Sequence, residues 1–286
     1  MKYYEVKFTL SPLTSDASDV LAALAGEAGF ESFEDAADGL KGYVQQQLFD
    51  REVLDTLLQS FPLPDTAITY TVAEAEDRDW NEQWEQEGFD PIVVNDRLVI
   101  HDGRHLPTPD FAGMTIEIDA RLAFGTGTHE TTRMVCSTLL DLFAASPSYA
   151  PRVLDCGCGT GILGIVAMKL GACECVAYDI DEWSVDNTRH NAVINQVELT
   201  PQQGDASILN HVEGTFDLVM ANINRNILLA DMPAFRRKMS PNARLILSGF
   251  YTEDIPLLTE KAATLGLNLT AQREDNGWAC IVLGLN

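Results

Sequence analysis

The sequence predicts an α/β protein with two domains, and three observations support this prediction. Between residues 3 and 73, stretches of alternating apolar residues are interleaved with two stretches of helical spacing. From residue 152 onward, apolar strands alternate with helices, a pattern typical of a parallel sheet covered by helices. Asn276-Gly277 then separates two apolar stretches and indicates a β-hairpin. We therefore expect a parallel sheet closed by an antiparallel hairpin after a smaller first domain.

The first domain is predicted to span residues 1–75. Its elements alternate in the order strand, helix, strand, strand, helix, strand, which is the order of a ferredoxin-like α+β domain. Period-two alternation marks the strands, and apolar residues at helical spacing mark the helices. The stretches are 3–10, 19–29, 30–33, 40–49, 51–60 and 67–73.

Residues 76–90 are predicted to form a linker helix. Trp80 and Trp84 lie one helical turn apart, so both indoles face the same side. We interpret them as packing anchors rather than as a ligand cage. Three short strand-like stretches follow, and the sequence does not place them in the fold: 92–94, 98–101 and 115–118.

The second domain is predicted to span residues 91–286. Its first two strands end in polar residues and are each followed by a helix, which gives the βαβα order. Two more strands, a helix and the hairpin complete it. The predicted elements are 153–154, 162–170, 175–180, 183–195, 217–221, 244–248, 254–265, 267–272 and 278–283.

The composition is that of a packed protein with an acidic surface. Of its 286 residues, 46% are hydrophobic, and 43 acidic against 19 basic residues give a net charge of -24. Residues 1–90 hold 20 acidic and 5 basic side chains, which gives them a net charge of -15. Such a field repels nucleic-acid phosphates and anionic membranes and attracts basic macromolecules, so we expect a basic partner and no direct nucleic-acid binding. Solubility alone is the alternative explanation of the charge.

The sequence contains no sign of export or membrane insertion. No basic segment followed by an apolar core opens the chain, and no apolar run of ~18 residues occurs in it. We therefore expect a cytoplasmic protein without a membrane association. The six cysteines are too sparse for a secreted disulfide framework.

A glycine-rich loop, VLDCGCGTGILG at residues 153–164, connects the first strand of the second domain to a helix. Gly157, Gly159 and Gly161 allow backbone N–H groups to approach a ligand closely, so we interpret the loop as a cofactor cradle. A purely structural turn is the alternative. Two Cys-x-Cys pairs occur here, one at 156/158 within the loop and one at 173/175 after the following helix. They lack the usual zinc spacing, and we interpret these cysteines as small buried apolar residues with no metal site.

Two nucleotide cofactors compete for this loop. A G-x-G-x-x-G pattern starts at Gly159, and Asp179 follows twenty residues later, as in dinucleotide-binding proteins. Asp155, two residues before the first glycine, favours a different ligand. Its carboxylate can accept from the cationic amino group of a methionine-type ligand, whereas it would repel a pyrophosphate. The loop therefore predicts S-adenosylmethionine rather than NAD.

Three polar residues follow later strands at the ligand side of the predicted sheet. Asp179 ends the second strand, where its carboxylate can accept both hydroxyls of a ribose, and Asp205 follows the third, where an adenine would lie. Asn222 follows the fourth strand and is placed to accept from a substrate. An ordinary loop acid is the alternative for the two aspartates, and a turn or helix-cap asparagine is the alternative for Asn222.

Several motifs occur together: AFGTGTHETT at residues 123–132, then D-x-G-x-G-x-G, then D-I-D at 179–181, and Ala-Asn-Ile at 221–223. In these motifs and in its tryptophan-bearing linker, the sequence resembles the ribosomal protein L-eleven methyltransferase family over nearly the whole chain. The resemblance implies a ferredoxin-like recognition domain, a connecting helix, and a seven-stranded class I methyltransferase (Rossmann-like) domain that uses S-adenosylmethionine.

The resemblance also implies the reaction and the residues that perform it. Members transfer methyl groups to amino groups, on lysine side chains or the N-terminal amine, of the basic large-subunit ribosomal protein L-eleven. The family's cofactor contacts, carried over to this sequence, fall on Thr132, Gly157, Asp179 and Asn222. Asn222 is also the expected catalytic residue. The full set expected to bind the cofactor is Thr132, Asp155, Gly157, Gly159, Gly161, Asp179, Asp205 and Asn222.

The sequence departs from the family after Asn222, where Asn224-Arg225-Asn226 stands in place of smaller residues near the acceptor pocket. Two other functions stay open on the sequence alone. One is a class I methyltransferase for a small molecule or nucleic acid, with a first domain that serves oligomerisation. The other is a non-catalytic scaffold that binds the cofactor. His129 could be a metal ligand, but no second His or Cys lies at a suitable local spacing.

Overall fold

The computed structural model describes residues 3–36, 38–46, 48–63, 66–74, 88–119, 127–146 and 148–285. The chain divides into two compact units, Met1–Trp80 and Asn81–Asn286. This division falls within the predicted linker helix, which lies outside the described residues except at positions 88–90, and those three are not helical. Trp80 and Trp84 also lie outside the described residues. No helix in the described ranges is long and apolar enough to cross a membrane.

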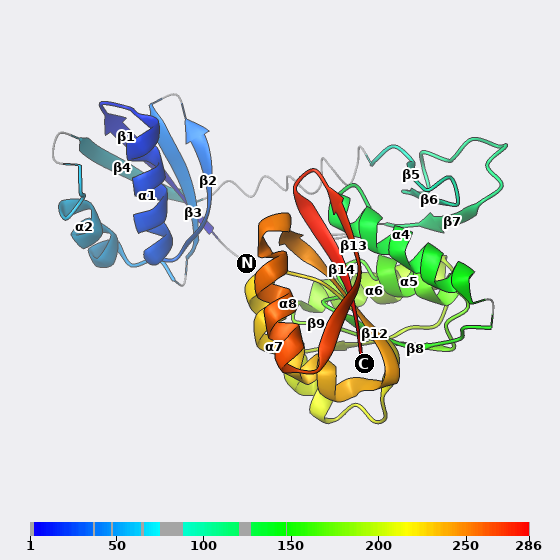
Figure 1. Ribbon diagram of the computed structural model, residues 1–286. Coiled ribbons are helices and arrows are strands. Elements are labelled where there is room, and N and C mark those ends of the chain that lie inside the picture. Colours follow the sequence, from blue (N-terminus) through cyan, green and yellow to red (C-terminus); the bar gives the residue numbers. More distant parts are fainter. Residues whose placement is uncertain are drawn as a thin grey trace. The chain divides into compact units, whose positions relative to one another are not determined.

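The first unit is a four-stranded sheet with two helices on one face (Figure 1). The strand order is β2-β3-β1-β4, and the neighbouring strands are antiparallel. Alternate residues of β1, namely Val6, Phe8 and Leu10, point into a core that α1 and α2 cover. The elements are β1 (Tyr3–Ser11), α1 (Ser15–Glu27), β2 (Phe30–Ala36), β3 (Gly39–Gln45), α2 (Arg51–Gln59) and β4 (Ala67–Glu74).

The second unit is built on a seven-stranded sheet of order β10-β9-β8-β11-β12-β14-β13. The first five of these strands are parallel, and β14 is antiparallel to both β12 and β13. The parallel sheet and the closing hairpin that the sequence predicted are therefore present. The strands are β8 (Arg152–Cys156), β9 (Glu174–Asp179), β10 (Thr200–Gln203), β11 (Phe216–Asn222), β12 (Met239–Tyr251), β13 (Leu267–Asp275) and β14 (Trp278–Leu285).

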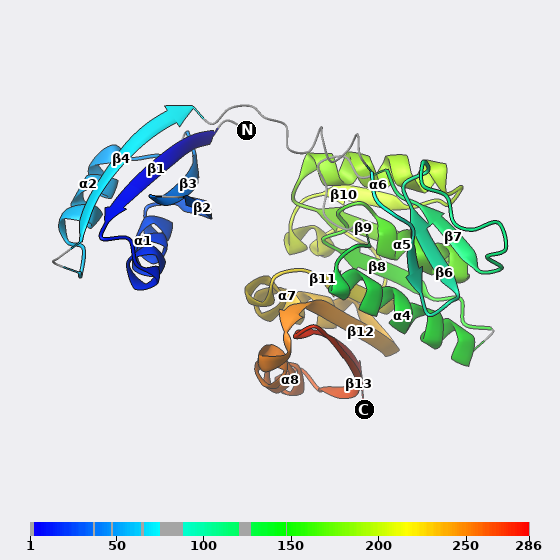
Figure 2. The ribbon, with the colours of Figure 1, turned by 90° about the horizontal axis from the view of Figure 1, so that it is seen from above.

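Helices cover both faces of this sheet (Figure 2). One face packs against α4 (Glu130–Ala145), α5 (Ile162–Leu170) and α6 (Glu182–Ile194). The other packs against the 3₁₀ turns η1 (Ala206–Asn210) and η2 (Thr252–Asp254), α7 (Arg225–Lys238) and α8 (Ile255–Thr264). Each face has its own apolar core, as expected for a sheet that alternates its side chains between two helix layers.

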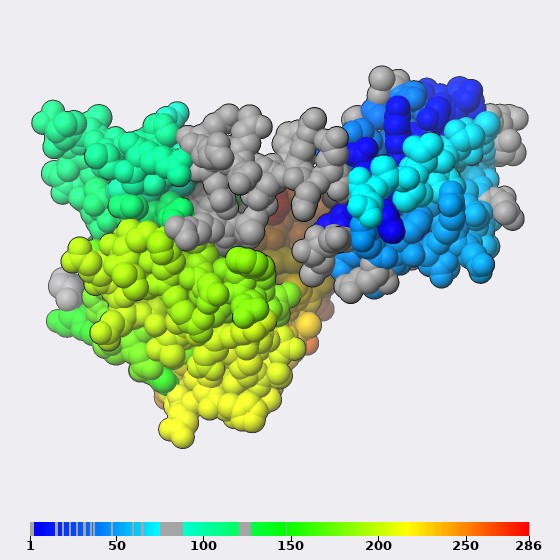
Figure 3. Space-filling model, turned by 180° about the vertical axis from the view of Figure 1, so that it is seen from behind, coloured from blue at the N-terminus to red at the C-terminus, as the bar shows by residue number. Residues whose placement is uncertain are grey.

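A small three-stranded sheet, which the sequence left unplaced, packs against α4 and α5. In Figure 3 its residues form the green-blue region next to the yellow-green residues of α6. Asn191 of α6 and Asn195, which caps the end of α6, hold this sheet: the N–H of Glu117 donates to Asn195 Oδ1 at 3.0 Å, and that of Asp119 to Asn191 Oδ1 at 2.9 Å. Its strands are β5 (Ile92–Val94), β6 (Leu98–His101) and β7 (Met114–Glu117).

Candidate functional site

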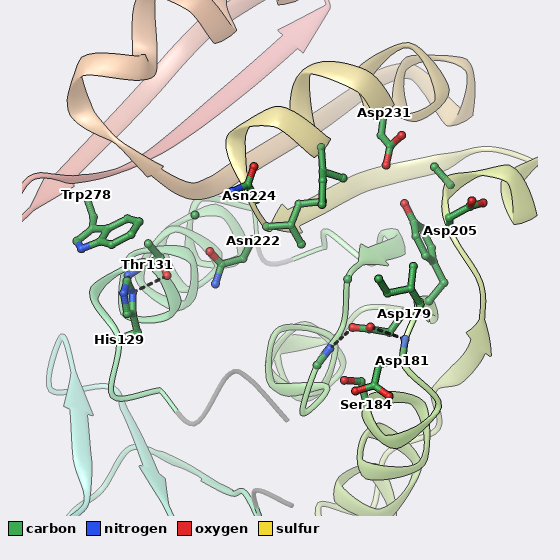
Figure 4. Close-up of a pocket in the computed structure, with 18 residues that line it drawn as sticks. His129, Thr131, Asp179, Asp181, Ser184, Asp205, Asn222, Asn224, Asp231 and Trp278 are labelled. Carbon is green, nitrogen blue, oxygen red and sulfur yellow. Dashed lines mark hydrogen bonds between the residues drawn. The ribbon is translucent and has the colours of Figure 1, made fainter. Parts of the chain in front are cut away.

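A pocket of about 810 Å³ lies at the carboxyl ends of the parallel strands (Figure 4). This is the side on which open α/β sheets bind ligands, because the loops after the strands converge there. Five of the residues expected from the sequence line it: Gly157, Gly159, Asp179, Asp205 and Asn222. The other three, Thr132, Asp155 and Gly161, are not among the lining residues.

The glycine loop between β8 and α5 has a backbone that requires glycine. Gly157, Gly159 and Gly161 have φ values of 74°, 53° and 80°, in the left-handed region that other residues rarely adopt. A Cβ on Gly157 would also stand 2.4 Å from the Ile223 side chain. The N–H groups of Gly157 and Cys158 donate to the Tyr178 carbonyl, at 2.8 and 3.0 Å. These N–H groups are therefore used inside the protein, and the loop shapes the pocket wall instead of offering them to a ligand.

Asp179 ends β9, and two backbone N–H groups hold its carboxylate. Its Oδ2 accepts from the N–H of Gly159 at 2.9 Å, and its Oδ1 accepts from the N–H of Asp181 at 3.1 Å. Each carboxylate oxygen keeps a further lone pair. The loop thus fixes a carboxylate at the pocket wall with acceptor capacity to spare.

Asp155, which was expected to meet a ligand's amino group, lies beneath the loop and is not among the residues that line the pocket. Side chains alternate along β8, and Asp155 points to the α5 face. It is fully buried, its Oδ2 accepts from the N–H of Gly164 at 3.0 Å, and its Oδ1 has no hydrogen-bond partner among the described residues. This burial raises the pKa of Asp155 to about 7.

The raised pKa of Asp155 predicts a pH-dependent stability. The ionised carboxyl is disfavoured in the folded protein, so stability is lost as pH rises from the ordinary aspartate pKa through about 7. Between pH 5 and pH 8 the wild type is expected to lose roughly 2–3 kcal/mol relative to Asp155→Asn, which cannot ionise. Urea unfolding followed by circular dichroism at the two pH values measures this difference. Parallel pH dependence of the two proteins would show that Asp155 does not titrate in this range.

Asn222 presents an amide to the pocket (Figure 4). Its Nδ2 donates to Thr132 Oγ1 at 3.4 Å, and its buried Oδ1 has no hydrogen-bond partner among the described residues. The helix cap that was the alternative for Asn222 is formed by Asn224, whose side chain accepts from the N–H of Asn226 at the start of α7. Asn222 is therefore free to accept from a ligand, and Thr132 lies behind it as a support.

Gly161 supports the loop from outside the pocket. It is the N-cap of α5, and its N–H donates to the carbonyl of Cys158 at 2.7 Å. Its left-handed backbone lets the chain pass from the loop into the helix.

Sequence reasoning missed an aromatic wall on the other side of the pocket. His129 is the N-cap of α4, where its Nδ1 accepts from the N–H of Thr131 at 3.2 Å. Its ring meets that of Trp278 edge to face, with centroids 4.6 Å apart, and Tyr251 packs on Trp278 at 4.2 Å. The hairpin signal before Trp278 was visible in the sequence, but nothing there indicated that this tryptophan reaches the pocket.

The sequence analysis expected the four cysteines of the two Cys-x-Cys pairs to be buried, and one of them is exposed. Cys156, Cys158 and Cys175 are buried, whereas Cys173 is exposed, because it lies at the turn before β9. All six are free thiols. Within the described ranges, no group of three or more His, Cys, Asp or Glu side chains is placed to hold a metal ion.

A pocket at the carboxyl ends of a Rossmann-like sheet, with an antiparallel hairpin at one end of that sheet, defines the methyltransferase class of fold. The sequence model of the family described as ribosomal protein L11 methyltransferase (PrmA) matches residues 17–285, and the chain belongs to this family.

Individual relatives agree with this assignment. The chain is 49% identical over 282 residues to a ribosomal protein L11 methyltransferase of Bacteroides fragilis, a match that covers 98% of this chain and 99% of that protein. It is 47% identical to one of Phocaeicola vulgatus, with 98% of each chain covered. Its structure is similar to the crystal structure of a ribosomal protein L11 methylase from Lactobacillus delbrueckii subsp. bulgaricus. That likeness has a TM-score of 0.61 and 27% sequence identity, and it covers 68% of this chain and 98% of the other.

Proposed function

We propose that this methyltransferase transfers methyl groups from S-adenosylmethionine to amino groups of ribosomal protein L11, on lysine side chains, the N-terminal amine or both. The observation that carries the proposal is the Asn222 Oδ1, a buried acceptor without a partner among the described residues, in the same pocket as the fixed carboxylate of Asp179. The printed names of the relatives support L11 as the protein that receives the methyl groups.

The residues of the pocket fit S-adenosylmethionine. Asp179, whose oxygens keep free lone pairs, would accept the two ribose hydroxyls, and Asp205 would lie at the adenine. Gly157 and Gly159 would form the wall beside it. When bound, the cofactor supplies a methyl group on a positively charged sulfur. Thr132, Asp155 and Gly161 would act indirectly, as supports of Asn222 and of the loop.

The acceptor amine must be neutral before it can attack, because an ammonium has no lone pair. A lysine has a reference pKa near ~10.4, and burial in a pocket favours the neutral form. Asn222 Oδ1 would accept one N–H of this amine and so direct its lone pair. Since an amide is uncharged, it orients the amine without stabilising the protonated form. No nucleophile on the protein is needed, and alignment and exclusion of water carry the reaction.

We further propose that residues 1–75 form a ferredoxin-like recognition domain, 76–90 a linker and 91–286 the methyltransferase domain. The β2-β3-β1-β4 order with both helices on one face supports the first assignment. The net charge of -15 on residues 1–90 suits a basic protein substrate.

Turnover on L11 is therefore expected to fall as salt rises. Because the charges act over a distance and are screened by ions, association with the substrate weakens while cofactor affinity changes little. We expect kcat/KM to decrease by about tenfold between low and physiological ionic strength, with a nearly constant kcat. Steady-state kinetics over a salt series measures this. A flat kcat/KM would mean that the acidic surface serves solubility only.

The proposed function is tested by incubating the full chain and radiolabelled S-adenosylmethionine with purified L11, with small amines and with RNA. Label in L11, located by mass spectrometry on amino groups, is the expected result. Label in the amines or RNA but not in L11 would favour the small-molecule or nucleic-acid methyltransferase. Cofactor binding without transfer to any acceptor would favour the non-catalytic scaffold.

A further inference from the structure

An ion pair links the segment after Asn222 to the loop after β12, and the chemistry proposed above does not use it. Arg225, the first residue of α7, donates from Nη1 to Asp254 Oδ1 at 2.7 Å, and the Asp254 side chain is only 10% exposed. Asn226 Oδ1 accepts from Arg225 Nε at 3.1 Å and so orients the guanidinium. Arg225 and Asn226 belong to the segment 224–226, in which the sequence departs from the family. That departure thus supplies the basic partner of this ion pair.

Asp254 in turn holds Tyr251 at the end of β12. Its Oδ2 accepts from the N–H of Tyr251 at 3.3 Å, and the N–H of Thr252 donates to the carbonyl of Gly277 at 2.8 Å. Tyr251 is the cross-strand partner of Trp278 in the antiparallel pair of β12 and β14, and the two ring centroids are 4.2 Å apart. A cross-strand aromatic pair favours one arrangement of both rings. The ion pair is thus connected to Trp278 through Tyr251.

Trp278 is the residue through which these contacts reach the pocket. Figure 4 places Trp278 and His129 at one end of the pocket, here called the aromatic end, with Asp179 across from them and Asn222 in between. The ribose proposed at Asp179 leaves the aromatic end to the methyl group and the acceptor amine. The Trp278 ring meets that of His129 edge to face at 4.6 Å, so its tilt decides the shape of this end. Because transfer requires the amine to be aligned with the methyl group, the orientation of the ring affects the rate.

We propose that Arg225, Asp254 and Tyr251 are positioning residues, which set the orientation of the Trp278 ring at the aromatic end of the pocket. This inference rests on the proposed methylation of L11 amino groups. The three residues are not among those that line the pocket, so they act on the acceptor through Trp278. A displaced ring gives the acceptor chain room to turn away from the methyl group. This lowers kcat and leaves the cofactor contacts in place.

The proposal is tested first at Tyr251, by steady-state kinetics with L11 and radiolabelled S-adenosylmethionine. Tyr251→Leu, which loses the ring, is expected to lower kcat by about tenfold. Tyr251→Phe keeps the ring and is expected to stay within about twofold of the wild type. The KM for the cofactor is expected to change by less than about twofold in both variants. A kcat of Tyr251→Leu equal to that of the wild type, or an equal loss in both variants, would overturn the proposal.

The ion pair is tested by a double-mutant cycle, which also decides the question if Tyr251→Leu does not fold. Asp254→Asn keeps an acceptor for the N–H of Tyr251 but loses the charge, and it is expected to lower kcat by about three- to tenfold. Arg225→Met is expected to lose a similar factor, and the double variant no more than either single one, because the partners act as a pair. Arg225→Lys keeps the charge and is expected to retain most of the activity. Losses that multiply in the double variant contradict the pairing.

Arg189→Met is the matched control, because Arg189 also makes a 2.7 Å ion pair, with Asp186, and neither residue is among those that line the pocket. Its kcat is expected to stay within about twofold of the wild type. The kcat of Arg225→Met is also measured against pH, since the lost positive charge offers a second route to a lower rate. A profile displaced from that of the wild type would show that Arg225 acts on the protonation of the amine, and the positioning role would be wrong.

The wild type separates this inference from the proposed function. If the wild type transfers no label to L11, both are wrong. If it does so and the variants at Tyr251, Arg225 and Asp254 match its kcat, the positioning role alone is wrong. Circular dichroism and titration with S-adenosylhomocysteine are expected to show an intact fold and cofactor site in each variant whose kcat is compared. A loss of kcat that only accompanies a loss of S-adenosylhomocysteine affinity would place these residues at the cofactor and overturn the inference.

Discussion

Replacing Asn222 with aspartate is expected to reduce kcat for methyl transfer to L11 by about 100- to 1000-fold. The two side chains have the same size, but a carboxylate favours the protonated form of a neighbouring amine. The acceptor would then bind as an unreactive ammonium, so KM for L11 is expected to stay level or fall while kcat falls. Steady-state kinetics with radiolabelled cofactor separates the two parameters.

Asn224→Asp is the matched control for this experiment. Asn224 lines the same pocket two residues further on, and aspartate is as good a helix cap as asparagine. We expect its kcat to change by no more than a few-fold. Equal losses in both variants would mean that added negative charge in the pocket, and not the amine contact of Asn222, causes the effect. Full activity of Asn222→Asp would remove Asn222 from the catalytic role.

Removing the carboxylate of Asp179 is expected to weaken S-adenosylmethionine binding by ~2–4 kcal/mol, because two charge-assisted hydrogen bonds to the ribose are lost. Asp179→Ala also leaves the N–H groups of Gly159 and Asp181 without their acceptor, so part of the loss comes from a looser loop. Titration calorimetry measures the total effect.

Deoxyribose analogues of the cofactor separate the two contributions to the Asp179 effect. If the hydroxyls bind Asp179, removing one from the ligand costs affinity in the wild type but not in Asp179→Ala, since the partners act as a pair. Thermal unfolding of the free variant reports the loop contribution on its own. An affinity for the intact cofactor that equals that of the wild type would exclude Asp179 from the site.

Strand ends were the part of the site that the sequence could predict. Asp179 and Asn222 each end an apolar strand, and parallel strands bring their carboxyl ends to one edge of the sheet. Their convergence in one pocket therefore follows from the order of elements alone. Asp205 follows β10, whose residues Thr-Pro-Gln-Gln carry no apolar pattern. The Asn276-Gly277 turn was predictable for a similar reason, because its two positive φ values of 48° and 81° match a two-residue hairpin loop.

Helices that are covered on most sides were harder to predict. In α4, ten of sixteen residues are buried, including Thr131, Thr132 and Thr138, so polar and apolar residues do not separate onto two faces. In α7 the apolar spacing does indicate a helix, because the buried Leu228, Met232 and Phe235 lie three or four residues apart. Pro233 stands among them, and a proline usually ends a helix. Without α7, nothing in the sequence could bring Asp231 to the pocket.

The depth of a side chain was not visible in the sequence. Asp155 was expected at the ligand because it stands next to the glycine loop, and in the structure it is fully buried on the α5 side of the sheet. A pattern of residue types does not reveal the position of one atom.

The strand β14 has a consequence for how this enzyme is made. It is synthesised after the six other strands of its sheet, yet it lies between β12 and β13, and it begins with Trp278 of the pocket wall. A nascent chain that has reached only β13 therefore exposes the unpaired edge of β12, a template for aggregation. The ligand pocket is still incomplete at that moment. Ligand-dependent stabilisation is thus available only to chains in which β14 is in place, and chains interrupted before it are left to chaperones and proteases.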